Sequence, residues 1–420
     1  MNSRRKVLRS LAAASLSLPW LSAMAGTQLK LPAENDPNYW DKIRDAFMLS
    51  KEKVFFNTGT VGAMPKIVVQ RVFEHFEKLA TDVADWDYKS DIGWIGGYHP
   101  LPDLRKKIAQ LIHADAASIA LTDNVTSAMS YIAMGLNLKP GDEVLASNQE
   151  HGGGRSSWIV RSKREGILYR EVVLPKPIRN NDEVLSIIRK AIRPETRVLM
   201  LSHIITGSGA ILPVREICAE ARAKGILTVL DGAQTIGQIK VDIAEIGCDA
   251  YVGCFHKWIG APPGTGFMWV RPDVLKTLWT SVSSYQWDNH EDEGFRFTQR
   301  GTGNFSILAG LDAALDFHAE IGPQRVYDRI KYLGQYLRDG LRKLPKVKIY
   351  SPVDEKMCAG ITVYNVAGRT GAQLQDAFWN LARMRPRSQG DEFGVRHCTH
   401  IYNSQKELDK ALEIVKSLAA

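Results

Sequence analysis

Two charged residues in the middle of the chain each follow a run that is typical of a buried strand. Asp231 ends the apolar run that starts at Ile226, and Lys257 follows the run that starts at Ala250. An isolated buried charge is costly, so each side chain needs a partner or a ligand. An amine withdrawn from water is easier to deprotonate and is then a nucleophile that condenses with an aldehyde. The pair therefore indicates covalent amine chemistry beside a carboxylate.

Pyridoxal phosphate accounts for both charges. Its aldehyde forms a Schiff base with a lysine, and its pyridinium nitrogen needs an anionic partner that keeps the ring an electron sink. We therefore predict that Lys257 binds this cofactor covalently and that Asp231 pairs with its ring nitrogen. Taken singly, Asp231 also fits a helix cap and Lys257 a surface loop, so the prediction depends on the two residues occurring together.

A candidate phosphate site lies between a predicted strand and a predicted helix. The segment Thr-Asp-Asn-Val-Thr-Ser at 122–127 overlaps the start of a helical pattern at 125–136. Free backbone N–H groups and a hydroxyl at a helix N-terminus bind a dianion. The segment fits an ordinary N-cap by Asn124 or Thr126 equally well. His256, next to Lys257, is placed to contact the same phosphate.

A histidine and three glycines follow the strand predicted at 143–146. In Glu-His-Gly-Gly-Gly at 150–154, the imidazole of His151 is suited to stack on an aromatic ring, and the glycines allow the backbone to approach a ligand closely. The same pattern occurs in the oxyanion loops of α/β-hydrolases, but those enzymes need a G-x-S-x-G elbow, which this sequence lacks. The sequence also lacks Walker A, G-x-G-x-x-G and H-E-x-x-H motifs.

Short apolar runs alternate with helical patterns from about residue 108 onward, which predicts an α/β fold with a parallel sheet. The expected strands are 118–121, 143–146, 197–202, 227–230, 250–253 and 266–270, and the expected helices are 125–136, 183–192 and 214–224. In such folds, ligands bind where strands end and the next loops begin. Beyond residue 301, a long helical pattern at 311–344, strands at 360–364 and 393–396 and a final helix at 405–418 predict a smaller α+β domain.

The first residues resemble an export signal. The pair Arg4-Arg5 precedes an apolar stretch at 11–21, and Ala-Met-Ala at 23–25 suits a signal peptidase. We expect a twin-arginine (Tat) signal peptide at 1–25, recognised by the Tat translocase, and a mature protein in the periplasm. An amphipathic N-terminal helix is the alternative. No later stretch has the length of a membrane-spanning helix.

Length, charge and cysteine content narrow the function classes. A chain of 420 residues exceeds the size of a single hydrophobic core, so two lobes are expected. The formal net charge is +8, of which four charges lie in the first nine residues, and the remainder is too weak to argue for nucleic acid. The five cysteines show no metal-ligand spacing, so we expect buried free thiols and no metal site.

Taken together, these motifs resemble the class V pyridoxal-phosphate-dependent aminotransferases, in the branch of the isopenicillin N epimerase-like proteins. The resemblance covers most of the chain after residue 25. Its markers are Phe56-Asn57-Thr58-Gly59, Asn124-Val125-Thr126, Glu150-His151, Ser202-His203 through Gly209 to Leu212-Pro213-Val214, Asp231-Gly-Ala-Gln234, His256-Lys257-Trp258, Pro263 to Gly266, Arg300-Gly301-Thr302 and Val395-Arg396.

The resemblance implies PLP-dependent transferase fold type I, with a mixed, mostly parallel sheet. It implies an N-terminal arm at 26–45, a large cofactor-binding domain at 46–315 and a small C-terminal domain at 316–420. Lys257 would form the Schiff base and shuttle the α-proton of the substrate. The other implied roles are Asp231 on the ring nitrogen, Gln234 on the ring hydroxyl, His151 stacked on the ring, Val125, Thr126 and His256 on the phosphate, Thr302 on the phosphate of the neighbouring subunit in a homodimer, and Arg396 with Asn57 on the substrate.

The implied activity is chemistry at the α-carbon of an amino acid or of an amino-acid-containing compound: transamination, epimerisation or elimination. Desulfurases carry a catalytic cysteine on a mobile loop, whereas Cys398 lies two positions after Arg396 and shares its strand face. This departure favours the epimerase-like branch over a cysteine desulfurase or lyase. The expected export signal is unusual in this superfamily, and the chain resembles in design an exported, periplasmic pyridoxal phosphate enzyme of pyoverdine siderophore maturation. A binding protein with a degenerate fold is the non-enzymatic alternative.

Overall fold

The computed structural model describes residues 31–81 and 101–420, and the predicted signal peptide at 1–25 and the first residues of the predicted arm lie outside them. A seven-stranded sheet forms the centre, in the order β2-β8-β7-β6-β5-β3-β4. Only β8 runs antiparallel to its neighbours, so the sheet is mixed and mostly parallel. Its strands are β2 (Ile119–Thr122), β3 (Glu143–Ser147), β4 (Leu168–Val172), β5 (Thr196–Ser202), β6 (Leu227–Asp231), β7 (Ala250–Cys254) and β8 (Gly266–Val270).

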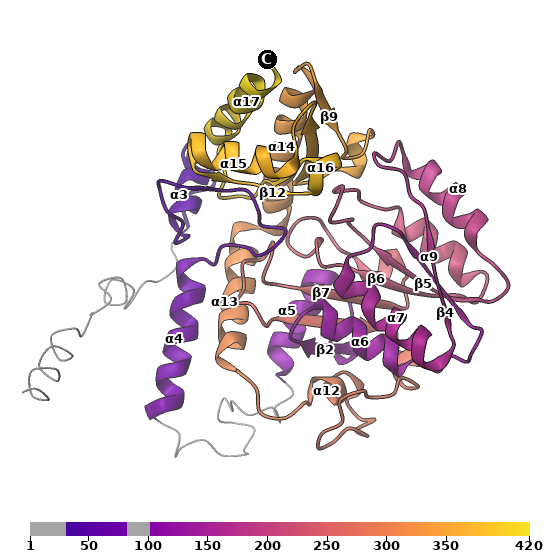
Figure 1. Ribbon diagram of the computed structural model, residues 1–420. Coiled ribbons are helices and arrows are strands. Elements are labelled where there is room, and N and C mark those ends of the chain that lie inside the picture. Colours follow the sequence, from indigo (N-terminus) through magenta and orange to yellow (C-terminus); the bar gives the residue numbers. More distant parts are fainter. Residues whose placement is uncertain (1–30, 82–100) are drawn as a thin grey trace, which may run out of the picture.

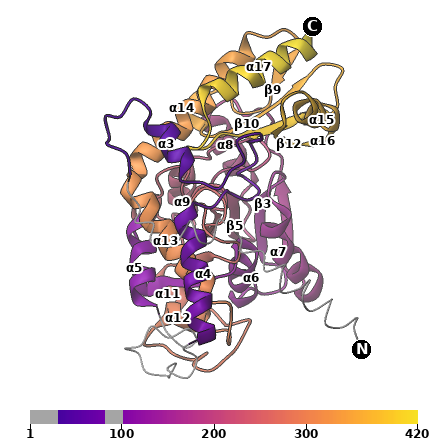
Figure 2. The same ribbon diagram turned by 90° about the vertical axis from the view of Figure 1, so that its left-hand side faces the viewer.

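Successive residues of the central strands point into two separate apolar cores, one on each face of the sheet. Leu199, Leu201 and Leu230 face one core, and Val198 and Met200 face the other. Helices therefore cover both faces (Figure 2), as burial of both sides of a parallel sheet requires. The first core is covered by α5 (Pro102–Ile112), α8 (Asn181–Ala191), α9 (Val214–Arg222) and α10 (Ile243–Ile246), and the second by α6 (Val125–Gly135), α7 (Gly152–Glu165), α11 (Pro272–Leu275) and α12 (Glu293–Thr298).

A second sheet lies in the C-terminal part of the chain, drawn in orange and yellow at the top of Figure 1. It is antiparallel, in the order β12-β13-β10-β9, and packs against helices α14, α15 and α17. The bounds are β9 (Val347–Ile349), β10 (Ile361–Val366), β12 (Arg387–Ser388), β13 (Val395–Cys398), α14 (Pro323–Arg342), α15 (Gly371–Ala382), α16 (Gly390–Phe393) and α17 (Gln405–Ala419).

The long helical pattern expected at 311–344 forms two helices, α13 (Ser306–Ile321) and α14. Gly322 separates them with a φ of 93°, and Pro323 opens α14 at a position where its missing N–H costs nothing. Helix α13 lies beside α4 (Lys66–Thr81) in both views (Figures 1 and 2). The predicted boundary between 315 and 316 falls inside α13, and the predicted division into domains stays a prediction.

Residues near the start of the described chain are joined to the C-terminal sheet region. After α3 (Tyr39–Asp45), strand β1 (Val54–Phe55) pairs in parallel with β11 (Met384–Arg385). The N–H of Cys398 donates to the carbonyl oxygen of Phe56 at 2.8 Å. Residues 59–62 therefore lie between the four-stranded C-terminal sheet and the loops that follow the central strands. None of the helices in the described ranges has the length and apolar composition needed to cross a bilayer.

Candidate active site

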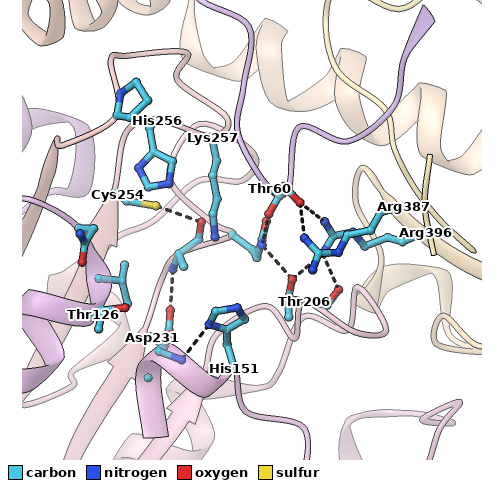
Figure 3. A pocket seen from close by; sticks show the side chains of 18 of the residues that line it. Thr60, Thr126, His151, Thr206, Asp231, Cys254, His256, Lys257, Arg387 and Arg396 are labelled. Carbon is cyan, nitrogen blue, oxygen red and sulfur yellow. Dashed lines mark hydrogen bonds between the residues drawn. The ribbon is translucent and has the colours of Figure 1, made fainter. Parts of the chain in front are cut away.

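A cavity of about 640 Å³ opens at the carboxyl ends of the central strands, where it meets residues of the C-terminal sheet. Most of the residues that the sequence assigned to cofactor and substrate line this cavity: Val125, Thr126, His151, Asp231, Gln234, His256, Lys257 and Arg396. Asn57 and Thr302 are not among the residues that line it. Figure 3 shows the cavity, with Lys257 reaching into it between Asp231 and His151 on one side and Arg387 and Arg396 on the other.

Asp231 is the last residue of β6 and is 4% exposed. Its Oδ1 accepts a hydrogen bond from the N–H of Ala233 at 2.8 Å. Burial raises the pKa of Asp231, and the Ala233 N–H and the nearby charge of Lys257 act against that rise. A cation bound beside the carboxylate would offset the cost of burying it, so a protonated ring nitrogen fits this position.

Lys257 lies on the loop after β7 and is half-buried. The segment at 59–62 packs closely against this loop, and the N–H of Gly62 donates to the carbonyl oxygen of His256 at 2.7 Å. A Cβ at Gly62 would stand 1.8 Å from the carbonyl oxygen of Lys257, so only glycine permits this approach. The backbone of the lysine is therefore fixed by a contact between two segments far apart in sequence.

The N-terminus of α6 faces the cavity. Asn124 caps the helix, since its Oδ1 accepts from the N–H of Ser127 at 3.0 Å and its own N–H donates to Ser127 Oγ at 3.3 Å. Asn124 is therefore an N-cap, and Val125 and Thr126 line the cavity at the positive end of the helix dipole, so their contact with a phosphate stays a prediction.

His256 completes this end of the cavity. Burial lowers the pKa of His256 to about 4, with Lys257 adding to the effect, and its buried Nδ1 has no hydrogen-bond partner among the described residues. A phosphate group accepts hydrogen bonds and carries negative charge. An unpartnered imidazole nitrogen beside a helix N-terminus is a fitting environment for it.

His151 is the N-cap of α7, and its Nδ1 accepts from the N–H of Gly153 at 3.1 Å. Burial lowers the pKa of His151, and Lys257 lowers it further. The neutral ring with a proton on Nε2 satisfies this hydrogen bond. The glycines that follow allow a close approach, because a Cβ at Gly153 would lie 2.4 Å from Thr126 Oγ1 and one at Gly154 would lie 2.9 Å from Asp231 Oδ2.

Gln234 lines the cavity, but its amide is already engaged within the protein. Nε2 donates to the carbonyl oxygen of Gly59 at 2.8 Å and to Thr206 Oγ1 at 3.0 Å, and Oε1 accepts from Trp258 Nε1 at 2.9 Å. The predicted contact with the ring hydroxyl therefore needs one of these bonds to be shared or exchanged. It stays a prediction.

Arg396 is buried at the opposite end of the cavity from Asp231. Its Nη1 donates to Thr206 Oγ1 at 2.7 Å, and its Nη2 donates to Asn57 Oδ1 at 3.0 Å and to Thr60 Oγ1 at 3.1 Å. Among the described residues, no carboxylate forms a salt bridge with it, and its Nε has no partner. The positive charge is therefore available to an anionic ligand, and Asn57 orients the guanidinium from behind the cavity wall.

Sequence reasoning missed Arg387, a second cation at this cavity. Strand β12 pairs with β13 so that Arg387 lies directly opposite Arg396, and Arg387 Nη1 donates to Thr60 Oγ1 at 2.9 Å. Two like charges opposite each other on antiparallel strands repel, which an anion between them would relieve. The segment Met-Arg-Pro-Arg contains two arginines, and the register that selects Arg387 is not visible in the sequence.

Thr302 does not reach the cavity of its own chain. The segment that carries it is fixed by Arg300, whose Nη2 donates to Asp123 Oδ1 at 2.7 Å and whose Nη1 donates to the carbonyl oxygen of Leu121 at 3.1 Å. The predicted role of Thr302 at a neighbouring subunit therefore stays a prediction.

All five cysteines are buried and unpaired. Cys398 lies under Gly59 beside Arg396, since a Cβ at Gly59 would be 3.0 Å from Cys398 Sγ and 3.2 Å from Arg396 Nη2. Cys254, which sequence reasoning did not assign to the site, lines the cavity, and burial raises the pKa of its thiol to about 11. Both thiols are buried, and the raised pKa of Cys254 keeps that thiol protonated, whereas an attacking thiol must be accessible and ionised.

Comparison with known proteins identifies the family of this arrangement. A family model described as Aminotransferase class-V matches residues 54–382. The isopenicillin N epimerase of Amycolatopsis lactamdurans is 30% identical over 407 residues, which span 90% of this chain and 98% of that protein. The isopenicillin N epimerase of Streptomyces clavuligerus is 28% identical over 400 residues, with the same coverage.

Desulfurases and lyases are also similar. The cysteine desulfurase of Serratia proteamaculans is 27% identical over 342 residues, which span 73% of this chain and 79% of that protein. A solved structure of a C-DES mutant with glycine covalently linked to its PLP cofactor has a TM-score of 0.80 and 25% identity, and it covers 89% of this chain and 98% of that one. The expected fold type, cofactor and enzyme class are thereby confirmed.

Proposed function

The chain belongs to the class V aminotransferase family, and on that basis we propose that this PLP-dependent enzyme acts at the α-carbon of an amino acid or of an amino-acid-containing compound, as an epimerase or an aminotransferase. One observation supports the proposal above all. A single cavity is lined by the amine of Lys257, the buried carboxylate of Asp231, the N-terminus of α6 and the guanidinium of Arg396, which has no carboxylate partner among the described residues. When bound, pyridoxal phosphate supplies an electron sink for a carbanion at the α-carbon.

The residues around the cavity divide the remaining tasks. Arg396 supplies the positive charge for the substrate carboxylate, and its terminal N–H groups, which donate to Thr206, Asn57 and Thr60, would exchange some of these partners for the carboxylate oxygens. His151 lines the cavity, where its neutral imidazole would stack on the ring of the bound cofactor. Lys257 provides the amine that holds the cofactor and afterwards carries the α-proton as base and then acid. Asp231 stabilises positive charge on the ring nitrogen, because its carboxylate has been removed from water.

The reaction type is tested by incubating the holoenzyme in D₂O with L-amino acids and with isopenicillin N, the compound named in the relatives' activity, followed by NMR and chiral chromatography. We expect exchange of the α-hydrogen for deuterium. Formation of the D-isomer identifies an epimerase, and formation of a 2-oxo acid identifies an aminotransferase. Lys257→Ala should abolish the exchange. Exchange that persists in this variant would contradict the proposal.

Cysteine desulfuration is the second candidate, and the desulfurase relatives favour it. The buried position of Cys398 and the raised pKa of the Cys254 thiol disfavour it. Incubation with L-cysteine and a reductant distinguishes the two. Sulfide release that Cys398→Ala abolishes would replace the epimerase proposal with a desulfurase. Release that this variant retains would indicate a lyase without a cysteine nucleophile.

We also propose that the enzyme is a homodimer in which Thr302 contacts the cofactor phosphate of the partner. Thr302 lies outside its own cavity, and the segment before it exposes the large apolar side chains Trp279, Val282 and Trp287. Light scattering measures the mass in solution, and a monomer would contradict the proposal. Thr302→Ala should weaken cofactor retention without altering the dimer.

Export to the periplasm by the Tat route, and a place in siderophore tailoring, are further proposals. They depend on the sequence of residues 1–25 and on the resemblance in design to exported enzymes of pyoverdine maturation. Fractionation of cells that produce the full chain tests the first. Replacement of Arg4-Arg5 by Lys-Lys should leave the protein in the cytoplasm, whereas periplasmic protein in that variant would contradict Tat export. The second is tested by adding pyoverdine-like peptides to the D₂O incubation.

A further inference from the structure

A second buried carboxylate lies beside the site and has no part in the proposed chemistry. Glu150 is 7% exposed and directly precedes His151. Ser147 Oγ donates to its Oε1 at 2.5 Å, and the N–H and Oγ of Ser202 donate to its Oε2 at 2.8 and 2.6 Å. All three contacts are donated to the carboxylate, so they favour its ionised form.

These contacts join the ends of two neighbouring strands, and a third strand ends beside them. Ser147 ends β3, Ser202 ends β5, and the register of β5 with β6 places Ser202 opposite Asp231. The N–H of His203 in turn donates to the carbonyl oxygen of Asp231 at 2.9 Å. Glu150 therefore fixes the turn that presents His151 to the same edge of the sheet that presents Asp231.

We propose that Glu150 is a positioning residue for the cofactor: it fixes the β3–α7 turn against β5, and its negative charge behind Asp231 increases the proton affinity of the bound cofactor. Glu150 does not line the cavity, so it acts through its neighbours and not by contact with the ring. Charges in a buried environment interact over longer distances than they do in water.

The titratable groups that interact with Glu150 are Asp231, Arg155 and Tyr169. Burial raises the pKa of Glu150 to about 7, and Asp231 contributes to that rise while the serine contacts oppose it. The charge of Glu150 also contributes to the raised pKa values of Arg155 on α7 and Tyr169 on β4. The titratable groups that face the cofactor position are Asp231, His151, Cys254, His256, Lys257, Arg387 and Arg396. Replacing Glu150 by glutamine removes one negative charge and leaves this set unchanged.

Glu143 provides a matched control. It is a buried glutamate at the other end of β3, it accepts a hydrogen bond from Thr196 Oγ1 at 2.6 Å, and it pairs with Arg170 at 2.6 Å. Glu143→Gln therefore perturbs the same strand without changing the charge near Asp231. Glu150→Asp keeps the charge with a shorter side chain.

The experiment follows the visible absorption band of the bound cofactor in purified holoenzyme between pH 6 and pH 10. We expect the midpoint of its pH titration to fall by on the order of one pH unit in Glu150→Gln, and to stay near the wild-type value in Glu150→Asp and Glu143→Gln. A wild-type midpoint in Glu150→Gln overturns the proposal, and so does an equal fall in all three variants.

If Glu150→Gln does not retain the cofactor, the same pH titration is carried out on Ser202→Ala, which removes the hydroxyl donor to Glu150 Oε2. Removing one donor disfavours the ionised carboxylate, so the midpoint should fall by a smaller amount, and an unchanged midpoint overturns the proposal. The inference rests on the proposed role of Lys257. Loss of the band on Lys257→Ala tests that role separately, because the present inference concerns only the midpoint and not the presence of the band.

Discussion

Arg396 is a buried cation whose hydrogen-bond partners are all neutral. Thr206, Asn57 and Thr60 satisfy its terminal nitrogens but bring no negative charge. A buried charge without a counter-ion is unfavourable, and a substrate carboxylate removes that cost when it binds. The free energy of substrate binding at this end of the cavity should therefore depend on the guanidinium itself.

Arg396→Lys keeps the charge and removes the paired donors. We expect KM for the amino-acid substrate to rise about 10- to 100-fold, with a smaller change in kcat, because a lysine cannot hold a carboxylate with two parallel N–H groups. Steady-state kinetics measures both constants. The control is Arg385→Lys, since the Arg385 guanidinium lies 4.1 Å from the centre of the Trp379 ring and does not line the cavity. An equal rise in KM in both variants would contradict this role.

At the scale of the elements, the sequence predicted the strands that present the site but not the contacts between distant segments. The runs at 227–230 and 250–253 match β6 and β7, because fully buried strands are continuous apolar runs. The sequence did not predict β4, whose residues Leu-Tyr-Arg-Glu-Val are only partly buried at the sheet edge. Three-residue β9 and two-residue β12 are too short to leave a pattern.

The candidate site was predictable to a similar extent. Asp231 and Lys257 were identifiable because a charged residue directly after an apolar run can be recognised in the sequence alone. Arg387 and Glu150 were not, since their roles depend on strand register and on which strand ends are neighbours. The close contact of Gly62 with the lysine loop joins residues almost 200 positions apart and has no sequence signal.

Gly62→Ala tests that contact. A methyl group 1.8 Å from the Lys257 carbonyl oxygen forces two backbones apart, so we expect at least a tenfold loss of cofactor affinity and activity. Gly152→Ala is the control, because nothing lies within 4 Å of the added Cβ and the residue stands at the start of α7. Cofactor binding is measured by fluorescence titration. Wild-type affinity in Gly62→Ala would show that the loop does not depend on this approach.

At the scale of the whole molecule, several histidines are enclosed in the protein interior. Burial lowers the pKa of His203, His318 and His400 to about 4 and that of His397 to about 3. His397 lies among the rings of Phe56, Tyr364 and Phe378 and has no hydrogen-bond partner among the described residues. These rings are neutral in the folded protein over a pH range in which the unfolded chain protonates them.

Acid should therefore destabilise the fold. Below a pH of about 6.5 the unfolded state binds more protons, so the free energy of unfolding falls as the pH decreases toward the lowered pKa values, by about 1.4 kcal/mol per pH unit for each histidine. His397→Phe should reduce the slope by about one such contribution. Urea unfolding between pH 7 and pH 5 measures both proteins, and their comparison removes the contributions that they share. Identical slopes would contradict this assignment.

The central claim is that one amine, that of Lys257, holds the cofactor. Hydride reduction of freshly purified holoenzyme, followed by proteolysis and mass spectrometry, tests it directly. We predict a reduced pyridoxyl phosphate adduct on the peptide that contains Lys257, and no adduct on Lys176, whose pKa burial lowers to about 8 and which is therefore the competing amine. An adduct on Lys176 or on another lysine, or no adduct at all, would contradict the account.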